Sequence, residues 1–490
     1  MIRWLGILLL LLTAACQAPP SDEIRMGLAT LPSNLDPRYA TDAASSRLCR
    51  LLYRGLTEFD VHSRPQPAMA QWQRLAPDRY RFQLLPGRGA FPDGRLPTAA
   101  DVQATYASIL DPATASPHRG TLAHIREIRV LDEAALEFEL SRPDYLFPGY
   151  LTIGILPARG LAAGRDFDRA PWGSGPFEFA GRPDDSRLQL RRRSDGQRFD
   201  FLAVPDPTVR VLKLQRGEID LLQNELPPEM IGYLQAQPGI TVQRHAGTSF
   251  AYLGFNLSDP LTGDSRVRRA VACAIDRVAI VRYLFAGNAR LAESILPPEH
   301  WSGVPARAAD PTRARALVAE LGHGPDRPLE LEYKTSSDPF RLRVAAALQA
   351  QLADVGIRLR IRSFDWGTFF ADIKAGRFQL YSLAWVGVES PDIYRYAFHS
   401  RSLPPDGANR GRYRSAKADA LIDAAETAPD VATRVSEWQA LQRLLHADLV
   451  YVPLWYEGHV AASGPRIRGY HLNRRGDYDG LAEVHLVTAP

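Results

Sequence analysis

The pattern that most restricts the fold is a helix that is closed by a glycine and followed at once by a short apolar strand. It occurs at residues 209–222, with Gly217 at the junction, and again at residues 366–383, with Gly376 at the junction. A glycine at a helix end and an apolar strand after it are typical of the helix-to-strand half of a β-α-β unit. The sequence therefore predicts α/β layers in both halves of the chain.

Shorter signals predict the other elements. Thr98, with Asp101 three residues later, predicts a capped helix start. Alternating apolar residues predict a strand at 23–30 and a hairpin at 72–85. Apolar residues at helical spacing predict further helices at residues 43–56, 266–285, 341–355 and 434–447.

The N-terminus has the form of an export signal. A positive Met-Ile-Arg start precedes eight apolar residues at 5–12, too few to cross a bilayer, and small residues precede Cys16. This predicts a signal peptide at 1–15, a tether at 16–21 and a lipid on Cys16. A lipoprotein signal usually has Leu three residues before the cysteine, where this chain has Thr13. Cleavage without lipid attachment therefore remains an alternative.

Composition and charge exclude several classes of protein. The 490 residues are 45% hydrophobic, and 59 basic residues face 55 acidic ones for a net charge of +4. Such a chain is neither disordered nor fibrous, and it is long enough for two large lobes. The Arg191–Arg193 run is interpreted as a solvated strand or loop, so no nucleic-acid partner is expected. The sequence leaves open whether Cys49 and Cys273 form a disulfide.

No catalytic motif stands out. The chain has no His-Glu-x-x-His, no Gly-x-Ser-x-Gly and no P-loop, and its eleven histidines are scattered. Ser174 lies between two glycines, but a turn into a strand explains it better than a nucleophile does. The sequence predicts no catalytic residue, no metal site and no cofactor. For an exported two-lobed chain this favours a binding protein over an enzyme.

Short motifs in a fixed order resemble one family, the bacterial extracellular solute-binding proteins of family 5. The resemblance covers residues 22–490. The motifs are NLDP at 34–37, LLYRGLT at 51–57, FPDG at 91–94 with TAADV at 98–102, GSGPF at 173–177, GEID at 217–220, FN at 255–256, VRRAV at 267–271 with AIDR at 274–277, and QL at 351–352 with VGI at 355–357.

The resemblance implies an α/β, two-lobed periplasmic-binding-protein fold (type II, cluster C-like) with an extra subdomain inserted in the first lobe. Lobe I would comprise residues 22–60, 174–262 and 463–490, the inserted subdomain residues 61–173, and lobe II residues 263–462. A solute would be enclosed between the lobes as they close by hinge motion. The protein would be a periplasmic or otherwise extracytoplasmic monomer that delivers its ligand to ABC permease subunits in the membrane.

The expected binding segment departs from the family pattern. Peptide-binding members commonly carry an Asp three residues after a Trp, and that Asp pairs with the α-ammonium of the peptide. Here Trp385 is present and the Asp position is Val388. A buried ammonium without an acceptor is costly to desolvate, so either Glu389 or Asp392 replaces the Asp, or the ligand lacks an amine there.

The residues expected to bind ligand share a place in or beside the segments that face the cleft in relatives. They are Trp385, Glu389, Asp392, Tyr394, Arg395, Asn34, Leu35, Tyr252, Asn256 and Trp172. Residues 404–410 are expected to form a surface loop that can reach the cleft rim. Arg395 would pair with a carboxylate or phosphate.

Three functions follow from these observations. The first is a receptor for an oligopeptide or peptide-like solute. The second, motivated by Val388, is a receptor for a non-peptide ligand such as a metal chelate. The third and most remote is an enzyme or periplasmic sensor on the same scaffold.

Overall fold

The computed structural model describes residues 22–302, 310–405 and 407–487. The predicted signal peptide lies outside these residues, as do Cys16 and all of the tether before residue 22. Cys49 and Cys273 are both free thiols, and Cys49 is buried. Across the described residues, no helix combines the length and apolarity needed to cross a membrane.

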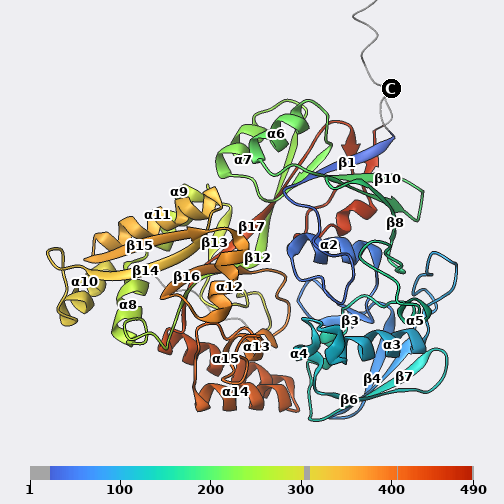
Figure 1. Cartoon of the computed structure of the whole chain (residues 1–490), viewed down its shortest axis with the longest axis horizontal. Helices are drawn as coiled ribbons and strands as arrows, with labels where there is room; N and C mark the ends of the chain where they lie inside the picture. The colour runs from blue at the N-terminus through green and yellow to red at the C-terminus, as the bar shows by residue number, and fades with distance from the viewer. Residues whose placement is uncertain (1–21, 303–309, 406, 488–490) are drawn as a thin grey trace, which may run out of the picture.

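One large mixed sheet runs through the molecule (Figure 1). Its strands lie in the order β15-β14-β16-β12-β17-β11-β1-β10-β9-β8, with β13 added against β17. Their bounds are β1 Glu23–Leu28, β8 Phe177–Asp184, β9 Arg187–Arg192, β10 Arg198–Ala203, β11 Leu221–Gln223, β12 Thr241–Phe255, β13 Ala289–Leu291, β14 Leu329–Ser336, β15 Ile357–Phe364, β16 Leu380–Trp385 and β17 Tyr451–Ser463.

The sheet divides into two halves joined by the long strands β12 and β17. We call the half around β1 and β8–β11 lobe I, and the half around β14–β16 lobe II; they lie to the right and left of Figure 1. One end of β12 pairs with the last residues of β17, which also pair with β11, and the other end pairs with β16. The register shifts between His245 and Ser249. The two-lobed α/β prediction is confirmed, and β12 belongs to both lobes.

The helices cover both lobes. They are α2 Ala43–Leu52, α3 Ala99–Leu110, α4 Arg119–Leu122, α5 Ala158–Ala162, α6 Pro207–Gln215, α7 Pro228–Gln235, α8 Ser265–Ala274, α9 Arg277–Leu284, α10 Pro311–Glu320, α11 Pro339–Ala353, α12 Trp366–Ala375, α13 Ile393–Phe398, α14 Ala416–Thr427 and α15 Val431–Asp448. Short 3-10 turns occupy Pro112–Thr114, Phe147–Tyr150 and Asp479–Ala482.

A separate four-stranded antiparallel sheet, in the order β4-β5-β7-β6, lies below the rest of lobe I in Figure 1. Its strands are β4 Ala70–Ala76, β5 Arg79–Leu84, β6 Ile125–Val130 and β7 Ala135–Leu140, and α3 packs on it. The predicted capping box is present, because Thr98 and Asp101 each bond the other's backbone N–H. Two small ribbons complete the fold: β2 Thr57–Phe59 with β3 Pro65–Pro67, and β18 Ile467–Arg468 with β19 His485–Leu486.

Both predicted helix-to-strand units are present, with a difference in the first. Helix α12 ends at Gly376, whose φ of 78° is one that glycine adopts without strain, and β16 follows. In the first unit Gly217 has a φ of 68°, but β11 begins only at Leu221. The buried Asp220 pairs instead with Arg25 and Arg466, and these contacts fix the chain just before the strand.

The prediction of one long helix at 266–285 is wrong. The structure has α8 and α9, separated at Ile275 and Asp276. The Asp276 side chain accepts a hydrogen bond from the Ala279 backbone N–H and so caps a new helix. Aspartate at this position favours a helix start more than a helix interior.

Candidate ligand-binding site

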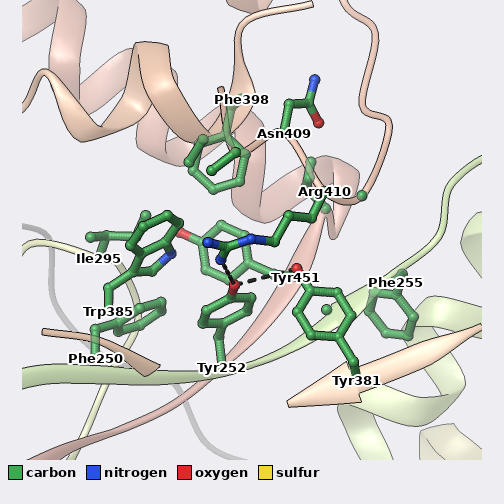
Figure 2. Close-up of a pocket in the computed structure, with 15 residues that line it drawn as sticks. Phe250, Tyr252, Phe255, Ile295, Tyr381, Trp385, Phe398, Asn409, Arg410 and Tyr451 are labelled. Carbon is green, nitrogen blue, oxygen red and sulfur yellow. Dashed lines mark hydrogen bonds between the residues drawn. The ribbon is translucent and has the colours of Figure 1, made fainter. Parts of the chain in front are cut away.

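A small aromatic pocket lies in lobe II, between the sheet and the loop that follows α13 (Figure 2). Its wall is formed largely by the rings of Phe250, Tyr252, Tyr381, Trp385, Phe398 and Tyr451. Strand pairing fixes part of this wall, since Tyr252 on β12 stands opposite Leu383 on β16 and so lies beside Trp385. The cavity has a volume of about 20 Å³, which is room for about one water molecule.

Arg410 also lines this pocket. Figure 2 shows its side chain extending across the aromatic wall. The guanidinium carbon lies 4.6 Å from the centre of the Trp385 ring, and Nη1 donates a hydrogen bond of 3.0 Å to the Tyr252 hydroxyl. The Trp385 and Tyr252 rings are stacked, with centroids 6.4 Å apart and an angle of 11° between their planes. A cation over an indole face is a favourable arrangement.

Two acidic residues follow Trp385 in the chain, the buried Glu389 and the half-buried Asp392. Glu389 is 7% exposed, and its Oε2 accepts a hydrogen bond of 2.6 Å from Ser63 of the inserted segment, while Oε1 is buried without a hydrogen-bond partner. Burial raises the pKa of Glu389. Burial also raises the pKa of Asp392, to about 6. Within the described part of the chain, neither carboxylate forms an ion pair.

Of the ten predicted residues, the structure brings only Trp385 and Tyr252 together in the pocket wall. Asn256 instead donates to the carbonyls of Gly376 and Phe378 and holds a turn. Tyr394 is fully buried, and its hydroxyl lies 2.6 Å from Ser294 Oγ. Arg395 pairs with Glu426 and Asp423 on α14.

The lobe I residues on the list have local roles. Asn34 Oδ1 accepts a hydrogen bond from the Asp36 backbone, and Leu35 is fully buried in the core of lobe I. Trp172 lies under two guanidinium groups, those of Arg159 and Arg165, at 4.5 and 4.8 Å from its ring. None of the three lines the aromatic pocket.

The sequence interpretation missed Arg410, although it placed residues 404–410 in a loop near the rim. It also missed Tyr381, Phe398 and Tyr451, which are aromatic residues within otherwise apolar strands and helices. A strand residue such as Tyr381 looks like ordinary core packing until the neighbouring strands are known. The pocket depends on the pairing of β12 with β16 and β17, which the sequence does not specify.

Comparison with known proteins decides the family. The model of the "Bacterial extracellular solute-binding proteins, family 5 Middle" matches residues 64–403. This chain is a family 5 solute-binding protein. As a member of family 5 it is extracytoplasmic, and the predicted resemblance is confirmed.

Several relatives resemble this family 5 protein over nearly its whole length. It is 28% identical to di/tripeptide-binding protein 2 of Pseudomonas aeruginosa (strain UCBPP-PA14) over 94% of each chain. NikZ of Campylobacter jejuni, solved with Ni(L-His), matches 95% of this chain and 100% of its own with a TM-score of 0.83 and 21% identity. The dipeptide-binding protein of Pseudoalteromonas sp. SM9913, solved with Met-Leu, gives the same coverage, TM-score and identity. The two structures establish the fold.

In this family 5 protein the four-stranded sheet region contacts lobe II directly. Arg142, after β7, donates to Glu426 Oε2 at 2.5 Å, and Arg395 donates to the same carboxylate at 2.8 and 2.9 Å. The Glu426 side chain is 1% exposed. Close by, His124 Nε2 lies 3.3 Å from Asp144 Oδ2 in a second buried pair. The shared Glu426 joins the inserted segment, through Arg142, to α13 and α14.

Burial sets the protonation of the second pair. It raises the pKa of Asp144 to about 7, with the charge of Glu426 as the next cause, and it lowers the pKa of His124 to about 4. Near pH 6 the pair therefore consists of a neutral carboxylic acid and a neutral imidazole. A carboxyl whose folded pKa is raised holds its extra proton below that value and loses its stabilising contribution as pH rises through it.

The free energy of unfolding of Asp144→Asn is expected to increase relative to that of wild type as pH rises from 5 to 8. Asparagine keeps the acceptor for the Leu146 backbone and never ionises. The gain should reach about 3 kcal/mol, because two pH units lie between pH 5 and the pKa of about 7 and each corresponds to about 1.4 kcal/mol. Urea denaturation at each pH measures it. The exposed Asp185→Asn is the control and should parallel wild type; a flat difference for Asp144→Asn would contradict the raised pKa.

Proposed function

We propose that this family 5 protein is the receptor of an ABC importer for a peptide or peptide-like solute. The observation that carries this proposal is that three charged side chains in or near the Trp385 segment have no ion pair within the described residues. They are Arg410, the buried Glu389 and the half-buried Asp392. A short zwitterionic ligand would supply an anion for Arg410 and a cation for one of the two carboxylates. The di/tripeptide-binding relative supports the same ligand class.

The proposal includes the setting of the receptor. Lipid attachment at Cys16 would hold a monomer at the membrane, where it would bind without turnover and deliver its ligand to the permease. Lobe I would comprise residues 22–60, 174–262 and 463–490, with the inserted subdomain at 61–173 and lobe II at 263–462. Contacts from Ser63 to Glu389 and from Arg142 to Glu426 support a closed arrangement of these parts.

A second candidate is a metal chelate, because Val388 stands where peptide receptors of this family commonly have an acid. The relative solved with Ni(L-His) supports this candidate. In the described ranges, no group of three or more His, Cys, Asp and Glu side chains is arranged to hold a metal ion. Such a ligand would therefore bring its own chelating atoms.

A thermal-shift screen tests the peptide proposal. Di- to pentapeptides are compared with their N-acetylated twins on the mature protein. We expect free-amine peptides to stabilise by about 2.7 kcal/mol at a hundred times their Kd. Acetylation should weaken binding about tenfold or more, because it removes the ammonium that Glu389 or Asp392 accepts. Trp385 and Glu389 are four residues apart, at most about 14 Å, which an extended tetrapeptide can span.

Glu389→Gln should reduce the difference between each peptide and its acetylated twin, while the exposed Glu133→Gln should not. If no peptide stabilises the protein, the peptide proposal is wrong and the chelate candidate is screened next. If an added peptide is cleaved, the proposal of binding without turnover is wrong.

A further inference from the structure

The guanidinium of Arg410 lies close to two aromatic rings. Its carbon lies 5.3 Å from the centre of the Phe370 ring on α12 and 4.6 Å from that of Trp385 on β16. Nη1 donates to the Tyr252 hydroxyl at 3.0 Å, and that hydroxyl lies 3.3 Å from the hydroxyl of Tyr381 (Figure 2).

The charge of Arg410 is not matched by the residues around it. Within the described ranges it has no carboxylate partner. Arg395 and Arg142, by contrast, share the buried carboxylate of Glu426. The pKa of the Tyr381 phenol is raised well above its usual value by burial, so this ring stays neutral. Ring contacts offset part of the cost of burying a cation, at about 0.5–2 kcal/mol each. They do not replace an anion.

Neighbouring groups add to the positive field. The Lys374 ammonium lies 5.2 Å from the centre of the same Phe370 ring that Arg410 covers. Arg412, two residues after Arg410, donates a hydrogen bond to the Lys374 backbone carbonyl. Asp372 on α12, two residues before Lys374, is already paired with Lys334 and Arg377. Lys374 is therefore a second cation at the Phe370 ring, although neither it nor Arg412 lines the pocket.

We propose that Arg410 binds a carboxylate of the ligand, which makes a carboxylate-bearing solute the class that this receptor takes. The planar guanidinium matches a carboxylate in a two-point contact, and the Tyr252 and Tyr381 hydroxyls are placed to add a hydrogen bond. A phosphate is a poorer fit, because its second negative charge would need further donors or cations in the site. This inference rests on the proposed peptide function and deepens it.

The test compares each ligand with a twin whose carboxylate is capped. The peptide ligands are di- and tripeptides with free or amidated C-termini. The other ligands are N-acetylamino acids and simple mono- and dicarboxylates, each compared with its amide. Calorimetric titrations use the wild-type mature protein, Arg410→Gln and Arg412→Gln. We expect amidation to raise the Kd about tenfold or more for wild type. Arg410→Gln should raise the Kd of the acid similarly and bring acid and amide within about threefold.

Arg412→Gln is the matched control, since it removes a neighbouring charge from the same loop and should change the Kd less than threefold. Equal losses in both variants, or equal binding of acid and amide to wild type, would overturn the proposal. If only the non-peptide carboxylates bind, and do so through Arg410, the inference holds while the peptide function fails. If no carboxylate of any class binds wild type, the inference is wrong. Far-ultraviolet circular dichroism verifies that each variant is folded.

Discussion

Glu426→Ala is expected to lower the free energy of unfolding by about 3–5 kcal/mol, the range for breaking a buried ion pair by removing one partner. The Glu426 carboxylate is 1% exposed and accepts hydrogen bonds from both Arg142 and Arg395. It also lies at the C-terminal end of α14, where a negative charge is unfavourable without cations nearby. The variant leaves two guanidinium groups without their shared anion. Urea denaturation at pH 7 measures the loss.

Asp423→Asn is the matched control for Glu426→Ala. Asp423 lies on the same helix and pairs with the same Arg395, but its side chain is 61% exposed. Exposed pairs contribute about 0–1 kcal/mol, because water screens them. A loss below about 1 kcal/mol for Glu426→Ala, or equal losses for both variants, would show that the contact between the inserted segment and lobe II is not a source of stability.

Trp438→Ala is expected to cost about 3–5 kcal/mol, the range for truncating a large buried aromatic residue. Trp438, on α15, is fully buried and stacks on Tyr394 with ring centroids 5.6 Å apart. Its removal leaves a cavity beneath α13, whose Tyr394 hydroxyl is hydrogen-bonded to Ser294. We expect a lower urea midpoint with an unchanged slope.

The same substitution at an exposed tryptophan provides the comparison. Trp366 begins α12, is 59% exposed and stacks on Phe370. Trp366→Ala should therefore cost less than about 1 kcal/mol in the ligand-free protein, because most of its surface is already in water. Similar losses at Trp366 and Trp438 would contradict the burial argument.

The fold could be predicted from the sequence because its signals are local. Gly376 ends α12 through a left-handed backbone conformation that suits glycine, and Thr98 with Asp101 caps α3 without help from distant residues. The single helix expected at 266–285 is wrong because Asp276 caps a new helix within the apolar run. Local side-chain chemistry therefore determines both the helix ends that were predicted and the one that was not.

The site could be predicted only in part. Trp385 and Tyr252 were expected in it, but Arg410 comes from a loop after α13 and reaches them only through the packing of that loop. Arg395 carried the same chemistry and was expected to bind ligand, yet Glu426 and Asp423 neutralise it. Whether a charge is matched depends on long-range contacts, and no pattern within the segment reports them.

The late position of β17 in the chain affects how the protein can fold during export. This strand lies between β12 and β11 and so completes the sheet of both lobes, although its residues 451–463 are near the C-terminus. A chain that emerges N-terminus first exposes unpaired strand edges on β11 and β12 until those residues follow. Both edges are closed only when β17 has joined the sheet between β11 and β12.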